Sequence, residues 1–403
     1  MSVSAPQVTR CFQLFLGRAP ESDAVLREHQ ALPNVFALIA VLYRSDEYRR
    51  RDLRPRWLRN LSDLLRSGGS ANGLRQQLLR EVATHGVQAH AAHPEEIYRG
   101  YVAEDAARLA ALIVKPAVPA EGFYVDCFGQ RFHPAHQPAI ANRLGQASAA
   151  LPLPGDGHLS DGIEYAAAAL AFEAVRSRER FSAVELGAGW GPWTTFFGLT
   201  AQALGFQRIQ LTAFEADANR FAHLREHLAQ NALVAADAAI TGDDGHLSWQ
   251  LLNAAAWWKN DTLLWPVQDN PQDAGMRAES LDHDQKADDY RGHQRRYREI
   301  PAFDIVERLQ AASPIDILHI DIQGSEAELV PQVMDFLNSQ VRSMFIGTHS
   351  RKIEGDLIEL LYQQGWLLLR EKPCRFDQDS KAPTLEGRTV ADGGQYWKNP
   401  RLQ

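Results

Sequence analysis

Residues 184–191 (VELGAGWG) carry the strongest structural signal in this sequence of 403 residues. An apolar segment that contains one acid, Glu185, runs into three glycines, and the pattern that follows predicts a helix over residues 193–204. Glycine permits a tight turn and lets a ligand lie against the backbone at the N-terminus of the next helix. The stretch therefore predicts a strand, turn and helix of an α/β domain, where the turn forms a dinucleotide site, a sulfonium-nucleoside site or only a glycine-rich turn.

A second predicted strand, residues 209–215, ends at Glu215, where a carboxylate can accept hydrogen bonds from both hydroxyls of a ribose. A dinucleotide site shares this geometry, but its fingerprint places the third glycine three residues after the second, and here the interval is two. Glu185 would also repel a pyrophosphate, whereas it suits a cationic sulfonium ligand with an amino group. The predicted cofactor-binding residues are Glu185, Gly187, Ala188, Gly189, Trp190, Gly191, Glu215, Ala216 and Ala238.

The rest of the chain predicts two domains. Residues 1–115 show helical spacing of apolar residues and are expected to form an all-α domain. From residue 116 onward, a hairpin (122–131) and a helix (162–178) are followed by alternating strands and helices, which predicts a mostly parallel sheet with helices on both faces. Further strands are expected over residues 232–240, 315–321, 341–347 and 366–370, and an aromatic-rich insertion over residues 242–300.

Three polar side chains follow or end the later strands. Asp321 ends the strand at 315–321, where ligands of open α/β sheets bind, and His319 shares its face by the period of two. His349 follows the strand at 341–347 and is predicted to be the general base that takes the proton of a hydroxyl acceptor. Asp321 could instead be a capping acid, and His319 a buried histidine of the core. A metal-assisted reaction is the alternative, but no dense aspartate cluster supports it, so no metal is expected.

These motifs carry a resemblance to the Rossmann-type methyltransferases that use S-adenosylmethionine. Residues 315–326 (IDILHIDIQGSE), 341–354 (VRSMFIGTHSRKIE) and 392–400 (DGGQYWKNP) resemble the FkbM family over about residues 120–403. That resemblance implies S-adenosylmethionine as cofactor and O-methylation of sugars or natural products. Residues 14–48 resemble a small helical domain found beside bacterial glycan-modifying enzymes.

The insertion carries several aromatic residues with polar neighbours. Sugars stack their apolar faces on aromatic rings and form hydrogen bonds at their edges, so a saccharide subsite is predicted here. The alternative is that the tryptophans only anchor a long flap to the domain. The predicted substrate residues are Trp257, Trp258, Trp265 and His283.

Composition narrows the choice of partners and compartment. The net charge of −8, without a basic stripe, argues against a nucleic acid partner. The longest apolar run, residues 35–43, is far shorter than the about 20 residues that a membrane span needs. Three scattered cysteines suit a reducing cytoplasm.

The sequence therefore predicts a cytoplasmic O-methyltransferase that acts on a saccharide hydroxyl of a bacterial polysaccharide or glycosylated product. The N-terminal helices could form a homo-oligomer or contact a glycosyltransferase. Two alternatives stay open: a nicotinamide-dependent oxidoreductase, and a non-catalytic scaffold of a glycan-assembly complex.

Overall fold

The computed structural model describes most of the chain beyond residue 98 and parts of the first 42 residues: 99–148, 161–267, 276–282, 289–293, 295–312 and 314–402, with residues 5, 8–9, 12, 19–32, 38 and 41–42. The chain divides into two compact units, residues 1–90 and 91–403. In the first unit, helix α2 (Asp23–Gln30) begins after Ser22, whose side chain accepts a hydrogen bond from the backbone of Val25. The other helices predicted there extend over residues outside the described part.

The second unit begins earlier than the boundary expected at residue 116. Helix α8 (Ala103–Ala110) belongs to it because the guanidinium of Arg370 donates two hydrogen bonds, of 2.9 and 2.8 Å, to the buried carboxylate of Asp105. The apolar pattern before residue 116 predicted a helix, but it gave no sign of this contact 265 residues further along the chain.

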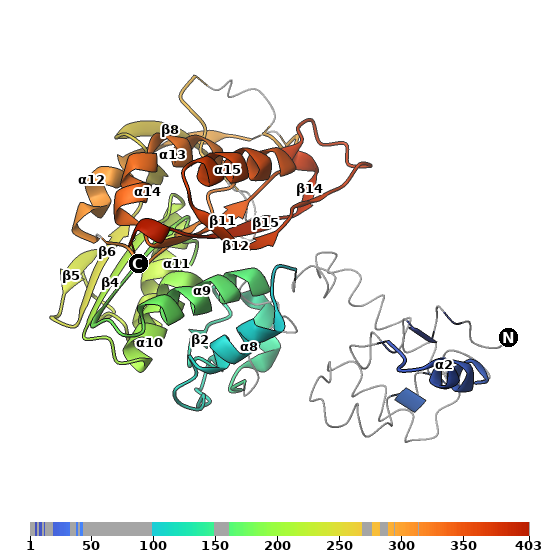
Figure 1. Cartoon of the computed structure of the whole chain (residues 1–403). Coiled ribbons are helices and arrows are strands. Elements are labelled where there is room, and N and C mark those ends of the chain that lie inside the picture. The colour runs from blue at the N-terminus through green and yellow to red at the C-terminus, as the bar shows by residue number, and fades with distance from the viewer. Residues whose placement is uncertain are drawn as a thin grey trace. The chain divides into compact units, whose positions relative to one another are not determined.

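The second unit is built on one eight-stranded sheet with the strand order β12-β15-β11-β10-β3-β4-β6-β5 (Figure 1). Strands β3, β4, β6, β10 and β11 run parallel, β15 is antiparallel to both β11 and β12, and β5 is antiparallel to β6. The strands are β3 (Arg180–Leu186), β4 (Arg208–Phe214), β5 (Thr241–Asp243), β6 (Leu247–Leu252), β10 (Ile317–Ile320), β11 (Ser343–Thr348), β12 (Leu367–Lys372) and β15 (Gly393–Lys398).

Helices cover both faces of this sheet, as Figure 1 shows. Alternate residues of β3 enter opposite cores: Phe181 and Ala183 pack on one side, Val184 and Leu186 on the other. The first core receives α9 (Gly162–Val175), α10 (Pro192–Ala203) and α11 (Ala218–Gln230), and the second receives α12 (Ile305–Leu309), α13 (Glu326–Gln332), α14 (Met334–Gln340) and α15 (Arg351–Gln363). The predicted fold, a mostly parallel Rossmann-like sheet with helices on both faces, is confirmed.

The third strand predicted at residues 232–240 is wrong. Helix α11 ends at Gln230, Ala232 takes a positive φ of 56°, and the chain forms no strand until β5. The strand that joins β4 is β6, which starts after a turn where Asp244 accepts hydrogen bonds from the backbone of His246 and Leu247. Ala238 therefore lies in the loop before the edge strand β5 and not at the end of a central strand.

The predicted insertion is also shorter than expected, because β5 and β6 inside it belong to the central sheet. What remains is a separate sheet of order β7-β9-β8, formed by β7 (Ala255–Trp257), β8 (Asp261–Pro266) and β9 (Tyr297–Asp304). The predicted hairpin at 122–131 is confirmed by β1 (Tyr124–Val125) and β2 (Arg131–Phe132), and β13 (Arg375–Phe376) pairs with β14 (Thr389–Ala391). Among the described helices, none is long and apolar enough to cross a bilayer.

Candidate functional site

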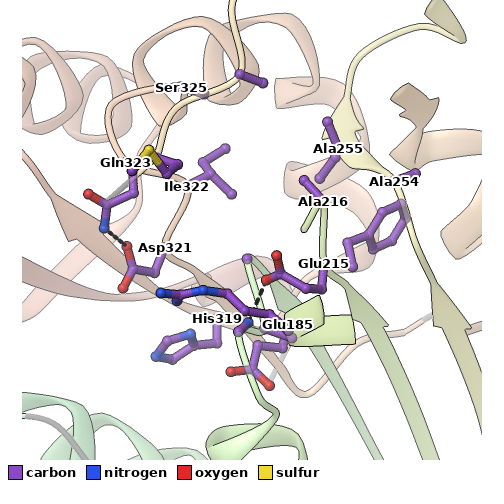
Figure 2. Close-up of a pocket in the computed structure, with 18 of the residues that line it drawn as sticks. Glu185, Glu215, Ala216, Ala254, Ala255, His319, Asp321, Ile322, Gln323 and Ser325 are labelled. Carbon is purple, nitrogen blue, oxygen red and sulfur yellow. Dashed lines mark hydrogen bonds between the residues drawn. The ribbon is translucent and has the colours of Figure 1, made fainter. Parts of the chain in front are cut away.

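A cavity of about 260 Å³ lies where β3, β4, β6 and β10 end. Figure 2 shows three groups of lining residues. On one side lie Asp321, Ile322, Gln323 and Ser325, opposite them lie Ala216, Ala254 and Ala255, and between the two lie Glu185, Glu215 and His319. The structure brings most of the predicted site residues to this cavity: Glu185, Gly187, Ala188, Gly189, Trp190, Glu215, Ala216, Trp257, Trp265, His319 and Asp321 line it. Gly191, Ala238, Trp258 and His349 do not line it, and His283 lies outside the described residues.

The glycines of the turn allow its backbone conformation and the close packing of the chain beside the cavity. Gly187 has a φ of +84°, and a Cβ atom there would lie 1.8 Å from the carbonyl oxygen of Asp321. Gly191 caps helix α10 with a φ of +80°, and a Cβ atom there would lie 2.2 Å from Leu224. Any side chain at Gly187 would therefore push apart the ends of the neighbouring strands β3 and β10.

Glu215 follows β4 and joins the glycine turn to the next helix. Its Oε2 accepts a hydrogen bond of 2.6 Å from the backbone N–H of Gly189 (Figure 2). Its Oε1 accepts one of 2.7 Å from the backbone N–H of Asp217. Asp217 in turn caps α11 by accepting from Asn219 and Arg220. Burial raises the pKa of Glu215 to about 7, so a carboxylate at this position gains from a ligand that donates hydrogen bonds to it.

Glu185 and His319 face the cavity from neighbouring strands, where they are paired in register. Burial raises the pKa of Glu185 to about 7, although its Oε2 accepts hydrogen bonds from the backbone N–H and the hydroxyl of Thr194. His319 lies 3.1 Å, through Nε2, from Oε1 of Glu164, a residue of α9. Burial would lower the pKa of His319, but the hydrogen bond and charge of Glu164 raise it.

Asp321 and His349 form an ion pair at the other side of the cavity. Nε2 of His349 lies 3.2 Å from Oδ1 of Asp321, and its Nδ1 lies 2.9 Å from Oε1 of the fully buried Glu326. Burial would lower the pKa of His349, but these two carboxylates raise it well above 6.5. The same pair lowers the pKa of Asp321 despite its desolvation. Gln323, with an unusual positive φ of 57°, donates a further hydrogen bond of 3.2 Å to Asp321 (Figure 2).

Two of the predicted saccharide residues, Trp257 and Trp265, line the same cavity as Glu215. Met276 and Ala278 continue this wall, and Trp258 stacks on Trp257 with ring centroids 4.0 Å apart. Trp265 is 8% exposed, and its indole N–H has no hydrogen-bond partner within the described residues. A buried donor without a partner is uncommon, so this indole is a candidate contact for a ligand in the cavity.

Several cavity residues had no signal in the sequence analysis. Glu164 was not predicted as a site residue, because an acid three residues after Asp161 indicates only the start of a helix. In the structure Glu164 does form the capping box of α9 with Asp161. Ala254 and Ala255 follow β6, which was placed too early in the chain. Within the described residues, no three His, Cys, Asp or Glu side chains are arranged to hold a metal ion.

Comparison with known proteins gives one strong relative. The chain is 31% identical over 287 residues to a protein of Jannaschia sp. (strain CCS1) named "Putative methyltransferase". The match covers 71% of this chain and 95% of that protein. No family model matches the sequence. The crystal structure of methyltransferase FkbM from Methylobacillus flagellatus KT is 13% identical and covers 55% of this chain and 44% of its own, with a TM-score of 0.33. Precorrin-6y C5,15-methyltransferase from Geobacter metallireducens GS-15 is 10% identical and covers 59% of this chain and 88% of its own, with a TM-score of 0.29.

Proposed function

The chain belongs to the methyltransferases, and from that premise we propose that it transfers the methyl group of S-adenosylmethionine to a hydroxyl of a saccharide. We infer the methyl donor from the charge of the cavity. Four carboxylates line it, those of Glu164, Glu185, Glu215 and Asp321, against Arg220 and His319 as cations. Such a lining attracts a ligand with a sulfonium and an ammonium group, and it repels the pyrophosphate of a nicotinamide dinucleotide.

The residues present fit this cofactor. Glu215 is placed to accept hydrogen bonds from the ribose hydroxyls, and the open backbone at Gly189, where a Cβ atom would meet nothing within 4 Å, leaves room for the amino-acid part. Trp257 and Trp265, beside Ala255, offer an apolar wall for the adenine. We therefore assign these two tryptophans to the nucleoside in place of the saccharide. When bound, S-adenosylmethionine supplies an electrophilic methyl group on a positively charged sulfur.

Asp321 is our candidate for the group that receives the proton of the acceptor hydroxyl. Its side chain is 42% exposed and opens onto the cavity, while His349 keeps it ionised and fixes its orientation. Gln323 limits its rotation from the other side. Positioning supplies much of the acceleration in an in-line displacement, so a carboxylate held at both sides is well suited to this reaction.

The saccharide class rests on the sequence resemblance of residues 315–326 and 341–354, which include Asp321 and His349. We further propose that the acceptor belongs to a bacterial polysaccharide or a glycosylated product. For the N-terminal unit, we propose contact with a glycosyltransferase or with a second copy of the chain.

Isothermal calorimetry with S-adenosylmethionine and with NAD tests the donor, and transfer of a labelled methyl group to a panel of saccharides tests the acceptor. Glu215→Ala should weaken cofactor binding by about 1.5–3 kcal/mol, the scale of hydrogen bonds to a charged group. Binding of NAD without binding of S-adenosylmethionine would overturn the donor. Methylation of a nitrogen, with no product from any hydroxyl, would overturn the acceptor.

A further inference from the structure

A second carboxylate, that of Glu164, lies near Glu185 at the cavity. It belongs to a helix, whereas Glu185 belongs to a strand of the sheet. Glu164 comes from the first turn of α9, on the same face of the sheet as Glu185 and His319. Its Oε1 accepts hydrogen bonds of 3.1 Å from the indole of Trp193 and from Nε2 of His319. All four of these side chains line the cavity.

Three acidic side chains surround His319. Glu164, Glu185 and Asp321 all act on this imidazole and raise its pKa, with Glu164 in direct contact with Nε2. His319 is 3% exposed, and its Nδ1 has no hydrogen-bond partner within the described residues. Because Glu164 and Glu185 line the same cavity and the charge of Glu164 also raises the pKa of Glu185, these two carboxyl groups suit a ligand that carries a positive charge and donates N–H bonds.

We propose that Glu164, together with Glu185, binds the primary ammonium of the cofactor's amino-acid part. This inference rests on the proposed function, since it assumes a cofactor with an ammonium group. The two carboxyl groups are held by different contacts: Glu185 accepts hydrogen bonds from Thr194, and Glu164 is in contact with Nε2 of His319. The two carboxylates make the cavity selective for cofactors and products that keep the amino group.

A purely structural role for Glu164 is the competing explanation, because its Oε2 also accepts the backbone N–H of Asp161 at 2.9 Å in the capping box. Glu164→Gln separates the two roles. Glutamine keeps an acceptor oxygen and is favoured at this capping position, but it carries no charge. Glu173→Gln is the matched control: it removes the same charge from the same helix at an exposed position paired with Arg108.

Calorimetry of three ligands provides the test: S-adenosylhomocysteine, S-adenosyl-3-thiopropylamine, which lacks the carboxylate, and 5′-deoxy-5′-methylthioadenosine, which lacks the amino group as well. Glu164→Gln should weaken the first two by about tenfold or more and change the third by less than about twofold, because only the ammonium loses a charged partner. Glu173→Gln should change none of them.

Equal weakening of all three ligands, or no weakening of any, would overturn the role of Glu164. Failure of the wild-type protein to bind S-adenosylhomocysteine would instead overturn the proposed function itself. Thermal unfolding of both variants checks that the fold of α9 is kept.

Discussion

Nε2 of His349 lies 3.2 Å from Oδ1 of Asp321, and of these two side chains it is Asp321 that lines the cavity. The buried Glu326 holds the other nitrogen of His349, so the imidazole is fixed between two carboxylates. An imidazolium held in this way is a poor general base, because a base must first lose its proton. We therefore propose the carboxylate of Asp321 as the proton acceptor, with a positioning role for His349.

The pH dependence of turnover distinguishes these two roles. If Asp321 is the base, its lowered pKa keeps it ionised, and kcat at saturating cofactor should show no acid limb from the base between pH 5 and 8. If His349 is the base, kcat should instead rise with pH through a pKa well above 6.5. Asp321→Asn should lower kcat by about 10²–10⁴-fold, the usual effect of losing a general base.

His349→Gln completes this test. Without the cation, the pKa of Asp321 should rise, and an acid limb should appear in the kcat profile of the variant. Two results together would return the role of base to His349. One is a near-normal kcat of Asp321→Asn, and the other is an acid limb above pH 6.5 in the wild-type kcat profile that disappears in His349→Gln.

Cofactor affinity should also depend on pH, through Glu185. Its pKa of about 7 in the free protein means that it is largely protonated at pH 6, and it must ionise to pair with an ammonium group. The affinity for S-adenosylhomocysteine should therefore fall as the pH drops below about 7, by up to about tenfold per pH unit. Calorimetry in buffers of different ionisation enthalpy should detect proton release at pH 6.

Glu185→Gln should flatten that profile. The ligand 5′-deoxy-5′-methylthioadenosine serves as the internal control, because it lacks the amino group and reports only the part of the pH dependence that arises from Glu215. If the two ligands show the same pH dependence, Glu185 does not contact the ammonium.

The local signals of the sequence were enough to place the glycine turn, Glu185 and Glu215, because each lies at the end of an apolar strand next to a turn. They failed where the apolar pattern was ambiguous: residues 232–240 contain as many apolar side chains as a strand, yet the chain turns at Ala232 after the end of α11, and the strand that joins β4 is the later β6. Glu164 could not be placed because its contact with His319 spans 155 residues, and no local pattern encodes such a distance.

Burial of Glu215 should make the free energy of unfolding depend on pH. The unfolded chain ionises Glu215 near pH 4.5, whereas the folded protein keeps it protonated until about pH 7. The free energy of unfolding should therefore fall between these two pH values, by about 3 kcal/mol for this residue. Glu215→Gln should unfold at a higher denaturant concentration than the wild type at pH 8, with the gap narrowing toward pH 4.5. A gap that stays constant with pH would mean that Glu215 is ionised at little cost.

Trp265 decides whether the aromatic wall serves the nucleoside or the saccharide. Trp265→Phe keeps an aromatic ring but removes the buried indole N–H that has no partner in the described part of the chain. Cofactor affinity should fall by about 2–10-fold, the value of one hydrogen bond, while KM for the acceptor at saturating cofactor stays unchanged. Trp249→Phe is the control, since that indole donates to the carbonyl of Ala239 and lies outside the cavity lining. A raised acceptor KM with unchanged cofactor affinity would instead restore the saccharide assignment of this tryptophan.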